Sequence, residues 1–252
     1  MTNELKVAIE AAKIGAKVAL KYFNKNLDIE LKSDNSPVTQ ADKEAEKAIK
    51  EVISRPYPSS SFLAEETIKT SLGADFWVID PIDGTKNFIR GLPFWGAEIA
   101  YVKNSEIVIG VTYAPCFDEL LYAEKGQGAY FNDKKISVSK ITKLSEAFLV
   151  HGTINYFERR IPQFLKLLRG IYRDRGFGDL YGYGLVAQGK ADIMMDARNG
   201  PWDIAPIKVI IEEAGGRVTN FEGEDWQLTD STAVATNGLL HDEVIRILNE
   251  RK

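Results

Sequence analysis

The stretch Phe76-Trp-Val-Ile-Asp-Pro-Ile-Asp-Gly-Thr85 decides the prediction of the fold. It begins with the apolar run Phe76–Ile79, which predicts a buried strand that closes on Asp80. Pro81 has no backbone N–H to donate, so we expect it to stop the strand from pairing further. The sequence therefore places a polar site at the end of a buried strand.

Two carboxylates and a glycine follow at this strand end. Asp80 and Asp83 are both expected to face the space beyond the strand. Gly84 and Thr85 are expected to open the next turn or short helix, where backbone N–H groups are free to bind a ligand. Carboxylates beside such N–H groups suit a divalent cation and a phosphate that bind together. The whole string is more specific for such a site than an isolated pair of aspartates.

Further acidic residues lie at the ends of other predicted elements. Glu65 and Glu66 follow the apolar run Phe62-Leu-Ala, and Asp42 and Asp203 each lie in the first turn of a predicted helix. Taken singly, a first-turn acid complements the helix dipole, and a glutamate at a strand end is ordinarily solvated. Because each of these acids adjoins an apolar run that would bury its neighbour, the whole set favours a shared site.

The composition narrows the class of protein. The chain has 252 residues, 44% of them hydrophobic, which is enough for one large α/β domain or two closely packed lobes. A formal charge of -4 argues against a surface that coats nucleic acid. With Cys116 as the only cysteine and His151 and His241 as the only histidines, cysteine-based zinc sites, internal disulfides and multi-histidine metal centres are excluded. The N-terminus lacks the apolar core of a signal peptide, and no apolar run reaches the ~20 residues of a membrane span, so we expect a soluble, cytoplasmic protein.

Hydrophobic periodicity predicts hairpins in the first half of the chain and alternating helices and strands in the second, which indicates a layered α+β or mixed α/β fold. Asn104 and Ser105 are expected to form a hairpin turn. The predicted helices are Asn3–Tyr22, Thr39–Ile53, Phe157–Leu168, Leu180–Gln188, Trp202–Glu213 and Leu239–Leu248. The predicted strands are Ser61–Ala64, Phe76–Ile79, Ala97–Val102, Ile107–Tyr113, Leu120–Ala123, Ala191–Met195, Arg217–Thr219 and Ala233–Thr236.

Several motifs occur together in one order along nearly the whole chain. They are Lys32-Ser-Asp-Asn-Ser-Pro-Val-Thr39, Glu65-Glu66, Asp80-Pro-Ile-Asp-Gly-Thr85, Trp202-Asp-Ile-Ala205 and Glu213-Ala-Gly-Gly216. In this order they resemble the inositol monophosphatase family. The resemblance implies an α+β fold arranged as a layered αβαβα sandwich, Mg²⁺-dependent and lithium-sensitive hydrolysis of small phosphate monoesters, and a homodimer. It implies a single phosphatase domain, 1–252, with a metal- and phosphate-binding lobe at roughly 1–140 and a substrate-specificity lobe at 141–252.

The resemblance also implies the metal ligands. Glu65, Asp80 and the backbone carbonyl of Ile82 are expected to hold one Mg²⁺, and Asp80, Asp83 and Asp203 a second, with Asp80 bridging. Glu65 is counted among the catalytic residues as well. Independently of the resemblance, converging carboxylates repel one another and raise each other's pKa values. Two cations about 4 Å apart remove that penalty and stabilise the entering and leaving oxygens of an in-line displacement.

The remaining catalytic roles follow from the same resemblance. Asp42 and Thr85 are expected to orient the attacking water, which the metal activates. The N–H groups of Gly84 and Thr85 are expected to cradle the phosphate. Lys32 and Ser33 belong to a mobile loop near a weaker third metal position, so two or three Mg²⁺ ions per site are expected.

The substrate is predicted from the segment Arg175–Gly189, in which a Gly-Asp pair precedes a tyrosine-rich helix. This segment resembles the histidinol-phosphatase branch of the family, as does Arg90-Gly-Leu-Pro-Phe-Trp95. Asp179 and Asp196 are expected to bind the ammonium or imidazole group of histidinol phosphate. Asp179 equally suits a helix N-cap for Leu180–Gln188, and Asp196 equally suits the hydroxyls of inositol 1-phosphate, which is the alternative substrate.

Other functions follow less directly. Arg159, Arg160, Arg169, Arg173 and Arg175 are most simply solvated charges, although one of them could reach the second phosphate of fructose 1,6-bisphosphate. The glycines that follow miss the dinucleotide fingerprint, so a nicotinamide enzyme is not expected. The expected partner is a small phosphate ester, with no direct nucleic-acid or membrane contact. A hypothesis of another class is a binding partner of the transcription machinery with residual phosphatase activity, and the complete acidic set argues against lost catalysis.

Overall fold

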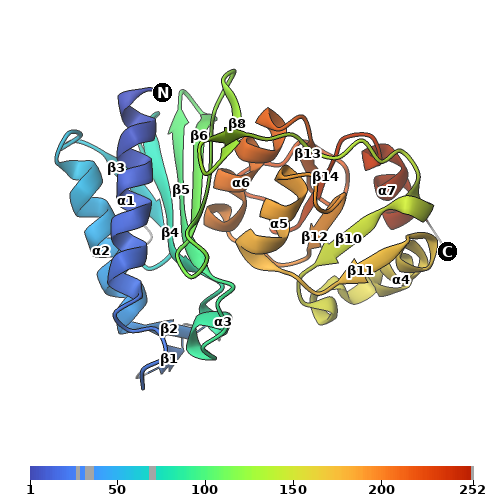
Figure 1. Cartoon of the computed structure of the whole chain (residues 1–252), viewed down its shortest axis with the longest axis horizontal. Coiled ribbons are helices and arrows are strands. Elements are labelled where there is room, and N and C mark those ends of the chain that lie inside the picture. The colour runs from blue at the N-terminus through green and yellow to red at the C-terminus, as the bar shows by residue number, and fades with distance from the viewer. Residues whose placement is uncertain (27–28, 32–36, 68–71, 251–252) are drawn as a thin grey trace.

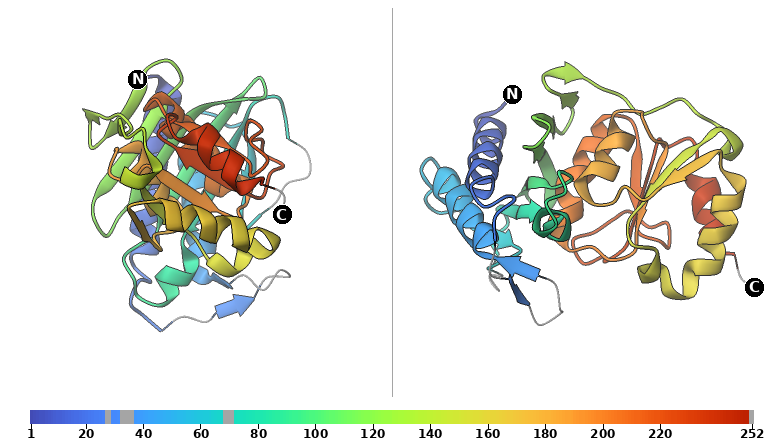
Figure 2. Two further views of the ribbon diagram at one scale, coloured as in Figure 1. Left: turned by 90° about the vertical axis from the view of Figure 1, so that its right-hand side faces the viewer. Right: turned by 60° about the horizontal axis from the view of Figure 1, so that its bottom comes forward.

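The computed structural model describes residues 1–26, 29–31, 37–67 and 72–250. Within these residues the elements form five layers: a helix pair, a sheet, a second helix pair, a second sheet and a third helix pair (Figure 1). Figure 2 shows the two sheets separated by the central helices, with the N-terminus beside the first helix pair and the C-terminus beside the last. The expected α+β fold with αβαβα layering is confirmed.

The first layer is the helix pair α1 (Asn3–Ala19) and α2 (Gln40–Ser54). Each helix begins after a threonine whose hydroxyl accepts a hydrogen bond from the first turn. The facing sides are rich in alanine and approach closely, since a Cβ at Gly15 would lie 2.5 Å from Cγ1 of Ile49. α1 ends before the predicted Tyr22, because the chain continues there as a series of turns.

The second layer is a sheet whose described strands follow the order β3-β4-β5-β6-β7-β8-β9. β3 and β4 pair in parallel, and each later pair is antiparallel. The predicted hairpin turn at Asn104 and Ser105 is confirmed, and both residues have the positive φ that a two-residue hairpin of this kind requires. The strands are β3 (Ser61–Ala64), β4 (Phe76–Asp83), β5 (Gly96–Lys103), β6 (Glu106–Ala114), β7 (Glu119–Glu124), β8 (Gly128–Phe131) and β9 (Lys134–Lys135).

The strand that carries the decisive motif is longer than predicted. β4 continues through Asp83, so the expectation that Pro81 ends the pairing is wrong. Pairing with β5 is interrupted after Asp80, which faces Glu98, and resumes where Asp83 faces Gly96. The bulge between these pairs accommodates the proline, which has no N–H to contribute to the ladder.

The third layer is the helix pair α5 (Asp179–Ala187) and α6 (Pro201–Glu213), which lies between the two sheets (Figure 1). α6 contacts β6 so closely that a Cβ at Gly110 would lie 2.0 Å from the carbonyl oxygen of Pro206. This contact fixes α6 against the first sheet, and the first turn of α6 carries Asp203 to the end of β4.

The fourth layer is a sheet in the order β11-β10-β12-β14-β13, and α4 (Ile161–Gly170) and α7 (His241–Leu248) cover its outer face. Alternate residues of one strand serve different cores, since Met194 packs toward the central helices and Met195 toward the outer pair. These strands are β10 (Phe148–His151), β11 (Arg173–Arg175), β12 (Ile193–Asp196), β13 (Arg217–Thr219) and β14 (Ala233–Thr236). Shorter elements are β1 (Ile29–Leu31), β2 (Pro37–Thr39), α3 (Thr85–Ile89) and the 3-10 turns Leu144–Glu146 and Ile154–Arg160.

Two helices begin later than predicted. α4 begins at Ile161 rather than Phe157, because Glu158 adopts a φ of 45° and interrupts the preceding 3-10 turn. α7 begins at His241, because the side-chain oxygen of Asn237 accepts the N–H groups of the two residues just before it. In the described ranges, no helix is long and apolar enough to cross a membrane.

The buried imidazole of His241 predicts a stability that depends on pH. Its Nε2 lies 3.0 Å from Thr219 Oγ1 and its Nδ1 lies 3.0 Å from Thr236 Oγ1. Because the Thr219 hydroxyl donates its proton to the carbonyl of Asn220, Nε2 donates to Thr219 Oγ1, and in the neutral ring Nδ1 accepts from the Thr236 hydroxyl. Burial, with Arg217 nearby, lowers the pKa of His241 to about 4.

The unfolded chain binds this proton near pH 6.5, whereas the folded chain binds it only near pH 4. The contribution of His241 to stability is therefore complete above pH 6.5 and is lost as the pH falls toward 4. Between pH 7.5 and pH 5, the unaltered chain is expected to lose about 2 kcal/mol more free energy of unfolding than His241→Gln. Urea unfolding of both proteins at both pH values measures the difference, and equal losses would contradict the prediction.

Candidate active site

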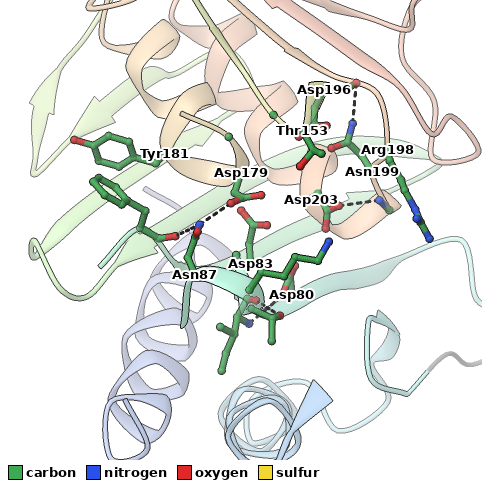
Figure 3. Close-up of a pocket in the computed structure, with 18 of the residues that line it drawn as sticks. Asp80, Asp83, Asn87, Thr153, Asp179, Tyr181, Asp196, Arg198, Asn199 and Asp203 are labelled. Carbon is green, nitrogen blue, oxygen red and sulfur yellow. Dashed lines mark hydrogen bonds between the residues drawn. The ribbon is translucent and has the colours of Figure 1, made fainter. Parts of the chain in front are cut away.

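Three carboxylates from distant parts of the sequence meet at the end of β4. Asp80 and Asp83 come from β4 and Asp203 from the first turn of α6, and each offers an oxygen within 4.8 Å of the others. Figure 3 shows the three side chains converging on one space. The structure thus brings together three of the acids that sequence analysis assigned to the metals.

Backbone N–H groups hold this acidic cluster in place. The N–H of Ile82 donates to Asp80 Oδ1 at 2.9 Å, and the N–H of Gly200 donates to Asp203 Oδ2 at 2.8 Å. The N–H of Leu180 donates to Asp83 Oδ2. Asp203 therefore caps α6 from its first turn, where its charge also complements the helix dipole, and it faces the cluster as well. The two roles are compatible because its two oxygens are available for different partners.

Burial and mutual repulsion disfavour the charged forms of these carboxylates. Burial is the largest cause and raises the pKa values of Asp80 and Asp83 well above the usual range, and that of Asp203 to about 8. Among the neighbouring charges, Glu65 contributes most to the raised pKa values of Asp80 and Asp203, and Asp179 contributes most to that of Asp83. A divalent cation at the cluster would relieve this repulsion, and a set of oxygen ligands without nitrogen or sulfur suits Mg²⁺. The residues present therefore fit a metal ion.

The other predicted metal ligands lie beside the cluster. Glu65 follows β3, and its N–H donates to the carbonyl of Ile79 at 3.1 Å, which extends the pairing of β3 with β4. The carbonyl oxygen of Ile82 accepts a hydrogen bond from the Thr85 hydroxyl at 3.0 Å. Glu65, Ile82 and Thr85 all line the same pocket as Asp80.

Gly84 joins β4 to the short helix α3 in a left-handed conformation, with φ of 82°. A Cβ at this position would lie 2.8 Å from the carbonyl oxygen of Phe94, so the turn requires glycine. Gly84 also lines the pocket. The predicted loop residues Lys32 and Ser33 lie outside the described residues.

Asp42 lies at the start of α2, where it forms a capping box with Thr39. Its Oδ2 accepts from the backbone N–H of Thr39 at 2.7 Å and from the Thr39 hydroxyl at 2.6 Å. Burial is the main cause that raises its pKa, and Glu65 adds to the shift. Among the described residues Oδ1 has no hydrogen-bond partner, and Asp42 is not one of the residues that line the pocket. Any role of Asp42 in orienting water therefore falls to this second oxygen.

A pocket of about 840 Å³ opens over the acidic cluster, and Asp179 lines it. The interpretation of Asp179 as a helix cap is wrong, since α5 has Gly178 as its N-cap without a side-chain cap bond. Asp179 Oδ2 instead accepts from the side-chain amide of Asn87 at 2.9 Å (Figure 3). Its φ of 55° lies in the left-handed region, which aspartate adopts more readily than most residues. Burial raises the pKa of Asp179, and Asn87 and Lys86 oppose the shift.

Asp196, at the end of β12, lines the same pocket. Its Oδ1 accepts from the N–H of Ala197 at 2.8 Å. A Cβ at Gly152 would lie 2.3 Å from Oδ2, so the chain needs glycine beside this carboxylate. Burial, reinforced by Asp179, raises the pKa of Asp196 to about 7. The structure thus brings both predicted substrate-binding acids to one pocket.

An aromatic wall, formed by Phe94, Phe117, Phe177 and Tyr181, adjoins Asp179. Ring centroids lie 4.9 Å apart for Phe94 and Tyr181 and 5.7 Å apart for Phe117 and Tyr181. Phe94, Phe177 and Tyr181 line the pocket. No local sequence pattern marks this wall, although three of its members, Phe94, Phe177 and Tyr181, lie in the segments that indicated the histidinol-phosphatase branch.

A cationic rim, formed by Lys86 and Arg198 together with Tyr156, which contacts both, also belongs to this pocket. Lys86 Nζ is 3.2 Å from the Tyr156 hydroxyl, and the Arg198 guanidinium lies 5.2 Å from the centroid of the Tyr156 ring. All three residues line the pocket. The five arginines that sequence analysis considered for a second phosphate are not among the lining residues described, so the cations of the pocket are different ones.

Comparison with known proteins agrees with this geometry. The model of the inositol monophosphatase family matches residues 1–252. The chain is 40% identical over 214 residues to a fructose-1,6-bisphosphatase/inositol-1-monophosphatase of Thermotoga maritima, covering 84% of this chain and 82% of that protein. It is 37% identical over 232 residues to a histidinol-phosphatase of Mycobacterium tuberculosis, covering 89% of each. The crystal structure of the extragenic suppressor protein suhB of Bartonella henselae matches with a TM-score of 0.93 at 30% identity, covering 100% of both chains.

The chain belongs to the inositol monophosphatase family, as its motifs indicated. It is a phosphoric monoester hydrolase, which confirms the class of enzyme predicted from the sequence.

Proposed function

We propose that this chain catalyses the Mg²⁺-dependent hydrolysis of a small phosphate monoester, and that its substrate is histidinol phosphate. The observation that carries the proposal is one pocket that is lined by the acidic cluster, by a second acidic pair, Asp179 and Asp196, and by members of the aromatic wall (Figure 3). The first part of the pocket suits a phosphate with cations, and the second suits a positively charged ring.

The proposed cation ligands are the carboxylates of Glu65, Asp80, Asp83 and Asp203 and the carbonyl oxygen of Ile82. Bound Mg²⁺ would activate water as the nucleophile and stabilise the charge of the leaving oxygen. Oxygen ligands alone are the preferred set for this hard ion. The raised pKa values of the aspartates reflect burial and the repulsion between neighbouring carboxylates, and a bound cation would relieve that repulsion.

The residues around the cluster position the phosphate and the water. The start of α3 at Gly84 and Thr85 receives no side-chain cap hydrogen bond, and N–H groups at such a helix start are suited to phosphate oxygens. The Thr85 hydroxyl is fixed by the carbonyl of Ile82, and Asp42 is fixed by Thr39, so neither side chain needs to be ordered when substrate binds. Asp42 and Thr85 are thereby proposed to orient the attacking water.

The charge and shape of the upper pocket favour histidinol over inositol. Histidinol carries an ammonium group and an imidazole ring, and Asp179 and Asp196 supply negative charge for them. Tyr181 and Phe94 present rings against which an imidazole can pack, with a further cation–π attraction when it is protonated. Inositol has neither charge nor an aromatic face. The relative named as a histidinol-phosphatase supports this choice.

The cationic rim favours a second candidate substrate, a bisphosphate such as fructose 1,6-bisphosphate. Lys86 and Arg198 lie at the pocket where the second phosphate of such a substrate would need a positive partner. The Thermotoga maritima relative has a name that combines this activity with inositol-1-monophosphatase. Because that name combines the two activities, both fructose 1,6-bisphosphate and inositol 1-phosphate are included as test substrates.

The test is phosphate release from histidinol phosphate, inositol 1-phosphate and fructose 1,6-bisphosphate, with Mg²⁺ and with EDTA. A kcat/KM at least about tenfold higher for histidinol phosphate, and absent in EDTA, is the expected result. Mg²⁺-dependent release with a preference for another ester would overturn the proposed substrate alone. Release that is equal in EDTA would overturn the proposed metal dependence.

Four further properties are proposed with this function: a homodimer, a cytoplasmic location, inhibition by lithium and folding of residues 1–252 as one domain. Sedimentation tests the homodimer, and cell fractionation tests the location. Inhibition curves test the effect of lithium, and a single unfolding transition would support folding as one domain. A monomer, a secreted protein, full activity in high lithium or two separate transitions would each contradict one.

A role as a protein partner of the transcription machinery is a proposal of another class. The suhB protein of Bartonella henselae is named a suppressor protein rather than an enzyme, which supports this proposal. The complete acidic cluster favours catalysis as the main function. Binding to purified RNA polymerase, measured with and without substrate, is the test, and the absence of binding would remove this alternative.

A further inference from the structure

Strand β5 carries a buried glutamate that the proposed mechanism does not use. Glu98 is fully buried and pairs directly with Asp80 across β4 and β5. Directly paired residues point to the same face of a sheet. On this face Val78 and Ala100 pack into the core shared with α5 and α6. Glu98 therefore lies on the same face as Asp80, toward the helix that carries Asp203.

The environment of Glu98 offers its charge no protein partner. Neither carboxylate oxygen has a hydrogen-bond partner among the described residues. The hydroxyl of Tyr183 on α5 is likewise buried without a partner there. A buried carboxyl group without a partner opposes folding, and an apolar residue at this position would avoid that cost. A cation near Glu98 would offset this cost.

The groups that act on Glu98 are those of the acidic cluster. Burial is the main cause that holds its pKa well above the usual range, and Asp83, Asp203 and Asp179 follow in that order. Glu98 in turn contributes to the raised pKa of Asp80. The same divalent cation that would balance the aspartates would therefore also lie within the field of Glu98.

We propose that Glu98 is a further carboxylate of the cation centre, and that its charge strengthens the binding of divalent cations from the sheet side of the acidic cluster. The inference rests on the proposed function, since it needs a cation at Asp80, Asp83 and Asp203. The oxygens that meet within 4.8 Å belong to these three aspartates, so Glu98 acts from behind them through its charge. It is a positioning residue for the cation and does not touch the substrate.

The test measures cation binding in the full chain without substrate. Mn²⁺ is the probe, and electron paramagnetic resonance of the free ion gives the Kd. Glu98→Gln keeps the shape and removes the charge, and Glu98→Met replaces the carboxyl with an apolar group of similar length. Glu106→Gln is the control, because it removes the same charge from an exposed residue at the far end of the β5–β6 hairpin.

Both Glu98 variants are expected to raise the Kd for Mn²⁺ on the order of tenfold, and Glu106→Gln to leave it unchanged. In EDTA, Glu98→Met is expected to melt at or above the temperature of the unaltered chain, since it removes an unpaired buried carboxyl. Weaker binding with an intact fold therefore reports the lost charge.

An unchanged or lower Kd in the Glu98 variants would overturn the inference and leave the proposed function standing. A failure of the unaltered chain to bind Mn²⁺ at all would instead overturn the proposed cation centre, and the inference with it. Should Glu98→Met unfold, the Kd of Glu98→Gln decides between these outcomes.

Discussion

Replacing Asp83 with asparagine is expected to lower kcat by at least about a thousandfold for every phosphate ester the enzyme accepts, which corresponds to about 4 kcal/mol of transition-state stabilisation. Asp83 is one of three buried aspartates whose oxygens meet within 4.8 Å. The amide removes one negative charge and one of the two candidate ligand oxygens. Because the remaining aspartates cannot hold the cation in the same geometry, the charge that develops on the leaving oxygen loses its partner.

The same substitution is expected to preserve the fold. The amide oxygen can still accept the N–H of Leu180, and the loss of one charge relieves the repulsion that raises the pKa of Asp80. Thermal unfolding in EDTA should therefore occur at or above the temperature of the unaltered chain, whereas the increase on adding Mg²⁺ should shrink.

Steady-state kinetics over a Mg²⁺ titration, combined with these unfolding curves, measures both effects. Asp133→Asn is the control, since it alters an exposed aspartate that bonds Tyr122 away from the pocket, and its kcat should stay near normal. A kcat for Asp83→Asn within tenfold of the unaltered chain would show that Asp83 is not a metal ligand.

Short apolar runs between polar turns predicted much of the fold. The strands Ser61–Ala64, Arg217–Thr219 and Ala233–Thr236 have the bounds that the sequence indicated. Hydrophobic pattern reports burial and not conformation, however. Phe157 is 2% exposed, as a core residue should be, yet it lies in a 3-10 turn before α4. Pro81 was expected to end β4 because proline cannot donate to a ladder, but a bulge lets the strand pass it.

The acidic part of the site was visible in the sequence because each aspartate or glutamate follows or precedes a buried run. The cationic rim of the pocket could not be predicted from the sequence. Lys86, Tyr156 and Arg198 come from three separate segments, and no local pattern relates them. Glu98 was hidden for a different reason, since it lies within the predicted strand Ala97–Val102 and only the pairing with Asp80 shows what it faces.

Asp179 is expected to decide between substrates. Asp179→Asn should lower kcat/KM for histidinol phosphate by roughly 30- to 100-fold, the scale of a lost charge-assisted hydrogen bond, and should change kcat/KM for inositol 1-phosphate far less. Asp179 lines the pocket beside Phe94 and Tyr181, where a positively charged group can contact the carboxylate and an aromatic face together. The loss should appear mainly in KM, because this charge acts at a distance from the reacting phosphorus and attracts ground and transition states alike.

The measurement compares kcat and KM for both substrates at saturating Mg²⁺, since Asp179 also raises the pKa of Asp83 and its removal can alter cation affinity. Asp242→Asn, an exposed aspartate of α7 that pairs with Arg217, provides the same loss of charge away from the pocket. An equal fall for both substrates would assign Asp179 to the cation centre, because an effect on bound cations cannot distinguish the alcohol that leaves. A fall confined to histidinol phosphate would assign Asp179 to substrate binding, since only a direct contact with the leaving alcohol depends on whether that alcohol is charged.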